Sequence, residues 1–204
     1  MNKIKNVLEF YNLTNKLKTV IRTGWQQWHI NAPRVESVAE HIYGTCMLAV
    51  AINSEFDYDI DIKKVVYMLA VHELEETIIG DITPFQDVSP EVKKQKGHEA
   101  VTKILKQLAK KSDIQSAIAE FEENKTIEAR FAKWVDKLEA GLQCKLYDMD
   151  GHINVSDENI EMARRHNLKV RNFARLSDSW LEYCIEKYGF DENFIKIAKE
   201  ARKQ

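Results

Sequence analysis

The chain has 204 residues, the length of one ordinary domain with room for additional helices. Its 30 basic and 32 acidic residues leave no charge excess that would direct it to a nucleic acid polymer or an anionic membrane. The 3 cysteines are far apart in sequence, a pattern that indicates neither a disulfide framework nor a cysteine zinc site and suits a reducing compartment. Residues 1–8 lack the apolar run of a signal peptide, and the longest apolar runs, 46–52 and 65–71, are far shorter than a membrane-spanning helix. We therefore expect a soluble, cytoplasmic protein with a single domain over residues 1–204.

Helices are expected to dominate, because the sequence has only 7 glycines and 3 prolines and is rich in helix-forming residues. Ser37 with Glu40 forms a capping box, and Ser89 followed by Pro90 is typical of a helix start. The predicted helices, in chain order, cover residues 3–21, 37–52, 61 onward, 89–108, 112–122, 126–146, 159–176, 179–187 and 192–202. Two connecting loops carry aromatic and charged side chains typical of binding sites, residues 22–36 and residues 80–88.

The helix that follows Asp61 contains the first chemical signal. Its apolar stripe consists of Ile62, Val65, Val66 and Leu69. In the same register the stripe continues as His72, Glu73 and Glu76, so a face expected to enter the core becomes polar. A buried carboxylate is costly unless it is paired, hydrogen-bonded or bound to a metal. The alternative is that this end of the helix emerges into solvent.

Two further polar residues lie on predicted helices beside apolar stripes. His41 follows the capping box of its helix, where a histidine that is satisfied within the core is the simple alternative to a ligand. Asp136 lies between Ala132 and Ala140, whose small side chains let another helix approach. A solvated ion pair with a neighbouring lysine is the alternative reading of Asp136.

Together, His41, the pair His72-Glu73 and Asp136 provide imidazole and carboxylate ligands for a divalent metal ion. A metal with open positions lowers the pKa of bound water and polarises a phosphoryl oxygen, as hydrolysis of a phosphate ester requires. The sequence therefore indicates a metal-dependent phosphohydrolase.

At these residues the sequence resembles the HD-domain phosphohydrolases, whose pattern is a histidine, then a His-Asp pair, then a distant aspartate. Segments that resemble the 5′-deoxynucleotidase branch are residues 22–25 (RTGW), 36–41 (ESVAEH), 80–84 (GDITP) and 125–130 (KTIEAR). The likeness spans about residues 20–145. It implies an all-α HD-domain helical bundle with additional C-terminal helices over about residues 157–204.

The resemblance also implies roles for individual residues. His41, His72, Glu73 and Asp136 would hold one divalent ion, with Mn, Co, Mg, Zn and Fe all open. Glu76 would handle the nucleophilic water, and Asp81 would lie near the sugar and phosphate. Arg22 and Trp25 would face the substrate, with a surface ion pair and a core anchor as their respective alternatives.

One position departs from the family pattern, because Glu73 stands where the second residue of the pair is usually aspartate. Its side chain is longer by one methylene, which puts the metal and the activity in question. The segment also resembles the His-Glu-x-x-His helix of zinc proteases, but Glu76 occupies the position of the required second histidine, so we reject a protease.

The favoured function is hydrolysis of deoxynucleoside 5′-monophosphates to nucleoside and phosphate. Two alternatives stay open at this point: a phosphohydrolase that acts on nucleoside triphosphates, and a non-catalytic nucleotide-binding regulator with a degenerate site. Members of this branch are commonly homodimers, and helices after residue 159 are a candidate interface. The expected partners are thus a small nucleotide and a second copy of the chain.

Overall fold

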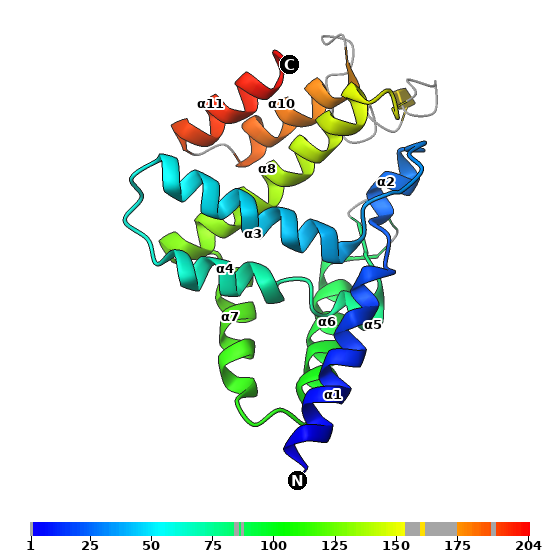
Figure 1. The fold of residues 1–204 in the computed structure, drawn as a ribbon, viewed down its shortest axis with the longest axis vertical. Coiled ribbons are helices and arrows are strands. Elements are labelled where there is room, and N and C mark those ends of the chain that lie inside the picture. Colours follow the sequence, from blue (N-terminus) through cyan, green and yellow to red (C-terminus); the bar gives the residue numbers. More distant parts are fainter. Residues whose placement is uncertain (1, 84–85, 87, 154–159, 162–174, 189–190) are drawn as a thin grey trace.

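The computed structural model describes residues 2–83, 86, 88–153, 160–161, 175–188 and 191–204. Helices make up its regular structure (Figure 1), and the expected all-α class is confirmed. Within the described residues the sole strand-like pairing is one isolated bridge between Ile21 and Ser37. In that same part of the chain, no helix has the length and apolar character that crossing a membrane requires.

Several helices begin where the capping residues predict. Their bounds are α1 Lys3–Thr14, the 3-10 helix η1 Asn15–Lys18, α2 Thr23–Gln27, α3 Val38–Glu55, α4 Ile62–Val71, α5 Glu76–Ile79, α6 Pro90–Leu105, α7 Lys111–Glu123, α8 Ile127–Met149, α10 Leu176–Tyr188 and α11 Glu192–Ala201. The capping box of Ser37 and Glu40 is confirmed at the start of α3. Asp61 and Ser89 accept hydrogen bonds from the first turns of α4 and α6, as predicted.

The predicted continuation of the α4 stripe through residue 76 is wrong. The helix ends at Val71 with His72 as its C-cap, and α5 begins only at Glu76. Between them the chain forms turns in which backbone N–H groups bond three residues back, as from Leu74 to Val71. His72 and Glu73 thus lie at and just after the end of α4.

Other differences from the sequence prediction are local. The first predicted helix changes to η1 after Thr14 and does not continue to residue 21. The predicted loop 22–36 contains the short helix α2. Most of the helix predicted over 159–176 lies outside the described residues, as do Pro84 and Phe85 of the loop 80–88.

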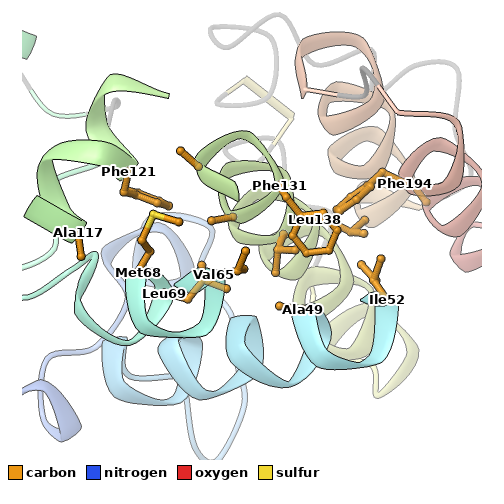
Figure 2. Packing of buried hydrophobic residues seen from close by; sticks show 14 of the residues in the cluster. Ala49, Ile52, Val65, Met68, Leu69, Ala117, Phe121, Phe131, Leu138 and Phe194 are labelled. Carbon is orange, nitrogen blue, oxygen red and sulfur yellow. The ribbon is translucent and has the colours of Figure 1, made fainter. Parts of the chain in front are cut away.

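Helix α8 lies at the centre of the structure and packs against α3, α4, α7, α10 and α11. The core between these helices is apolar (Figure 2), with Val65 and Leu69 of α4 and Phe131 of α8 essentially inaccessible to solvent. Burying each such side chain contributes about 1.5–3 kcal/mol to folding. The polar residues of α3 and α8 described next therefore lie on helices that this buried core holds together.

Candidate metal centre

The structure brings the predicted metal ligands together from separate parts of the chain. His41 lies in the first turn of α3, and Asp136 lies midway along α8. His72 and Glu73 lie in the turn that follows α4. One potential ligand atom from each of these four residues lies within 4.8 Å of those from the other three. Each of the four is buried or nearly so.

The contacts within this cluster centre on Asp136. Its Oδ1 atom lies 3.1 Å from Nε2 of His41 and 4.0 Å from Nε2 of His72. Oε1 of Glu73 lies 3.5 Å from the same His72 nitrogen. The other oxygen of Asp136, Oδ2, is 3.0 Å from the ammonium group of Lys137. The carboxylate thus contacts the two histidines through Oδ1 and the lysine through Oδ2.

His72 provides the clearest test of whether these residues fit a metal ion. Its Nδ1 lies 2.7 Å from the backbone carbonyl of Leu69, which can only accept, so Nδ1 carries the proton. The remaining nitrogen, Nε2, is buried and has no hydrogen-bond partner within the described part of the chain. A buried nitrogen lone pair that faces two carboxylates suits a bound cation, and the cluster is therefore able to bind a divalent metal.

The two histidines differ in how readily they take up a proton. Burial lowers the pKa of His72 below its usual value. Burial acts in the same direction on His41, but hydrogen bonds with Asp136 and Glu139 outweigh it and raise the pKa of His41 to about 9. In the absence of a cation, a proton on His41 thus compensates part of the buried negative charge.

Glu76 lies beside the cluster as the first residue of α5 and is 1% exposed. Its Oε2 has no hydrogen-bond partner among the described residues. Burial, reinforced by the negative charges of Glu73 and Asp81, raises its pKa to about 11. A positive charge bound nearby would lower this pKa, so the protonation state of Glu76 depends on whether the cluster holds a cation.

Arg22 and Asp81 meet at the start of α2. The Arg22 guanidinium lies 3.9 Å from Oε1 of Glu73, which places it at the edge of the ligand cluster. Asp81 accepts a hydrogen bond of 2.6 Å from the backbone N–H of Thr23, and the Thr23 hydroxyl donates to the Asp81 carbonyl at 2.7 Å. Asp81 thereby fixes the segment that carries Arg22.

Trp25 has the contacts of a core anchor. It is 6% exposed, and its ring lies edge-on to Tyr147 at a centroid distance of 5.5 Å. The indole N–H donates to Glu36 at 2.7 Å. These contacts match the alternative reading of Trp25, and contact with substrate stays a prediction for this residue.

Sequence reasoning missed two buried carboxylates behind His41. Glu139 of α8 lies 2.5 Å from His41 Nδ1, and Glu36 is within 4.8 Å of both residues. The available signal for Glu139 was its position three residues after Asp136, on the same face of the helix. For Glu36, the sequence carried no comparable signal.

Comparison with known proteins identifies the family of this chain. A family model described as an HD domain matches residues 14–177. The chain belongs to the HD-domain family. That family is the one expected from the sequence, and its ordered set of a histidine, a histidine-acid pair and a distant aspartate is the set that converges here.

Several HD-domain relatives have named activities. The chain is 34% identical to 5′-deoxynucleotidase HDDC2 of Dictyostelium discoideum over 156 residues, covering 73% of this chain and 81% of the relative. It is also 34% identical to 5′-deoxynucleotidase hdd1 of Schizosaccharomyces pombe, covering 72% and 76%. The human 5′-deoxynucleotidase HDDC2 is 32% identical, covering 71% of this chain and 69% of that protein.

A solved structure supports the HD-domain fold. The crystal structure of a predicted metal-dependent phosphohydrolase from Magnetospirillum magnetotacticum superimposes with a TM-score of 0.68. The match covers 98% of this chain and 90% of that one at 20% sequence identity. Identity at this level bears on the fold alone.

Proposed function

We propose that this protein is a metal-dependent phosphohydrolase that converts deoxynucleoside 5′-monophosphates to nucleoside and inorganic phosphate. The observation that carries the proposal is the convergence of His41, His72, Glu73 and Asp136 within 4.8 Å in an HD-domain chain. The substrate class is supported by relatives that are named 5′-deoxynucleotidases.

His41, His72, Glu73 and Asp136 would hold one divalent ion, with Mn, Co, Mg, Zn and Fe as the candidates. Two imidazoles and two carboxylates favour a transition metal such as Mn, Co, Zn or Fe over Mg, which prefers oxygen ligands alone. When bound, such an ion supplies a water of lowered pKa and a Lewis acid for a phosphoryl oxygen. Glu73 reaches the cluster from the turn after α4, and its carboxylate is the longer substitute for the usual aspartate.

Glu76 is the proposed acid-base residue. Its carboxyl is buried beside Glu73 and keeps one oxygen without a partner among the described residues, so that oxygen is free to bond with water or substrate. A base must be ionised, and the positive charge held by the ligand cluster would lower the raised pKa of Glu76 toward that state. Removal of the charge would return Glu76 to its protonated form.

Arg22, Asp81 and Trp25 are the proposed substrate-binding residues. The Arg22 guanidinium offers planar N–H donors to phosphate oxygens at the edge of the ligand cluster. Asp81 orients Arg22 through Thr23 and is the proposed neighbour of the sugar and phosphate. Trp25 would present an edge of its ring to the sugar or base, although most of its surface packs internally.

Phosphate release tests the substrate class. Full-length protein is incubated with Mn²⁺ and with deoxynucleoside 5′-mono-, di- and triphosphates and the matching ribonucleotides. We expect release from the deoxynucleoside monophosphates in preference to the others. Preferred turnover of triphosphates would favour the alternative phosphohydrolase, and binding without any turnover would favour a regulator.

We also propose that the protein acts as a cytoplasmic homodimer, with no nucleic acid polymer or membrane as partner. The C-terminal helices after residue 159 remain a candidate interface. On α3, the exposed apolar side chains of Tyr43, Met47 and Val50 recur at one-turn spacing and form a further stripe that a second copy would cover. Light scattering should give twice the chain mass of 23.8 kDa. A monomeric mass at micromolar concentration would contradict the dimer.

A further inference from the structure

Glu139 lies behind the ligand cluster and contacts one of its members. Its Oε2 is 2.5 Å from Nδ1 of His41, whereas Nε2 on the other side of the same ring faces Asp136 at 3.1 Å. Glu139 is 7% exposed, so water competes little for this contact. A carboxylate at Nδ1 favours the tautomer with the proton on that nitrogen and leaves the Nε2 lone pair for an ion.

The space for the Glu139 side chain is provided by a glycine on the facing helix. A Cβ atom at Gly44 would lie closer to Glu139 Oε1 than Cβ atoms approach their neighbours in proteins, and its 3.1 Å distance from Cδ would be unusually tight. Gly44 lies within α3, where glycine costs about 1 kcal/mol of helix stability relative to alanine. Close approach of the carboxylate is a physical reason for glycine at this position.

The two helices repeat the same spacing. On α3, Gly44 follows His41 by three residues, and on α8, Glu139 follows Asp136 by three residues. Residues three apart lie on one face of a helix. The ligand pair, His41 and Asp136, and the supporting pair, Gly44 and Glu139, therefore form adjacent layers between α3 and α8. Packing of these helices against each other thus sets both layers at once.

Glu36 is a neighbouring carboxylate with a different partner. It accepts the indole N–H of Trp25 at 2.7 Å, and within the described part of the chain it forms no hydrogen bond with His41. Like Glu139 it is buried and lies within 4.8 Å of His41. It therefore serves as a control carboxyl group that is also buried near His41 but makes no hydrogen bond to this proposed ligand.

We propose that Glu139 is a positioning residue for metal binding, which fixes the orientation and tautomer of His41, and that Gly44 is required to make room for it. The inference rests on the proposed function, because it assumes that the ligand cluster binds a divalent ion. It extends that function by assigning roles to two residues that touch neither the ion nor the substrate.

The first test is Mn²⁺ affinity, measured by titration calorimetry on the full-length wild type and on Glu139→Gln, Glu139→Ala and Glu36→Gln. Loss of a residue that orients a metal-bound histidine typically weakens binding by about 10- to 100-fold. We expect weakening in this range for both Glu139 variants and wild-type affinity for Glu36→Gln. Melting of the metal-free proteins in chelator reports separately on folding, and Glu139→Gln should melt close to the wild type.

The second test is a double-mutant cycle with Gly44→Ala. In the wild type the added methyl displaces the Glu139 carboxylate, so Mn²⁺ affinity should fall. In the Glu139→Ala background the obstructing carboxylate is absent, and Gly44→Ala should cause no further loss. Additive losses would overturn the role of Gly44.

The remaining outcomes separate the inference from the function on which it rests. Absence of Mn²⁺ binding by the wild type would overturn both the metal site and the inference. Tight binding by wild type and both Glu139 variants would overturn the inference alone. Equal weakening by Glu36→Gln and Glu139→Gln would indicate a general effect of buried charge and would also overturn it. If the Glu139 variants fail to fold, Gly44→Ala alone still decides between weakened and unchanged affinity.

Discussion

The loss of one ligand from the cluster should remove the ion and the activity together. His41→Ala or Asp136→Ala leaves a gap in the ligand set and changes the buried charge at the point where three helical segments meet. We expect no bound metal and no phosphate release from either variant. Metal analysis by mass spectrometry on the purified proteins checks this, and full occupancy in both would place the metal site elsewhere.

Glu76→Gln should separate metal binding from turnover. The amide has the shape of the carboxyl but can neither accept nor release a proton at the reacting water, and Glu76 is not one of the proposed ligands. We expect metal content and melting behaviour like those of the wild type and a turnover lower by roughly 10²- to 10⁴-fold. Unchanged turnover would leave Glu76 with a structural role only.

At the scale of residues, the sequence was informative where polar side chains interrupted an apolar stripe. This pattern correctly predicted that His72 and Glu76 are buried, although α4 ends at Val71. The order of these residues relative to His41 and Asp136 resembled that of a known family. The partners behind the ligands could not be identified, because a glutamate on a lysine-rich helix such as α8 is usually solvated. Glu139 becomes distinctive only when α3 brings His41 and Gly44 against it.

The loop between α5 and α6 depends on the backbone conformation of one glycine. Gly80 has φ 73° and ψ 173°, a region that residues with a side chain enter at a cost of about 1–3 kcal/mol. Gly80→Ala should therefore lower the free energy of unfolding by this amount. Because Asp81 follows directly and holds Thr23, the variant should also weaken substrate binding through Arg22.

Urea unfolding of the metal-free proteins measures the effect, and Gly24→Ala is the matched control. A methyl group at Gly24 meets no atom within 4 Å, and the residue lies in α2 without a positive φ angle. We expect Gly24→Ala to be at least as stable as the wild type, because alanine is favoured over glycine in a helix. Equal stability of Gly80→Ala and Gly24→Ala would contradict the strained conformation described for Gly80.

At the scale of elements, helix starts were predictable and one helix end was not. Ser37, Asp61 and Ser89 have side chains that bond the free N–H groups of a first turn, so these starts are encoded locally. The end of α4 at Val71 has no glycine or proline to mark it, and periodicity alone predicted a continuous helix. The turn is instead accompanied by contacts that form only on folding, such as the hydrogen bond from the His72 side chain to the backbone carbonyl of Leu69.

For the whole molecule, metal binding should raise thermal stability. The metal-free fold buries several carboxylates near one another, and a ligand that binds only the folded state stabilises it by about 2.7 kcal/mol at 100 times its Kd. For a chain of this size, that corresponds to a rise in Tm of roughly 5–10 °C. Differential scanning fluorimetry with Mn²⁺ and with chelator checks this, and Asp136→Ala should show no rise under the same conditions.

The most direct test of the central claim is phosphate release from a deoxynucleoside 5′-monophosphate by the full-length chain. The assay compares protein loaded with Mn²⁺, the same protein after chelation, and Asp136→Ala in the presence of Mn²⁺. We predict release by the loaded wild type, its loss on chelation with recovery when Mn²⁺ is restored, and none from the variant. Release that persists in the chelated protein or in Asp136→Ala would contradict a metal-dependent phosphohydrolase built on this cluster.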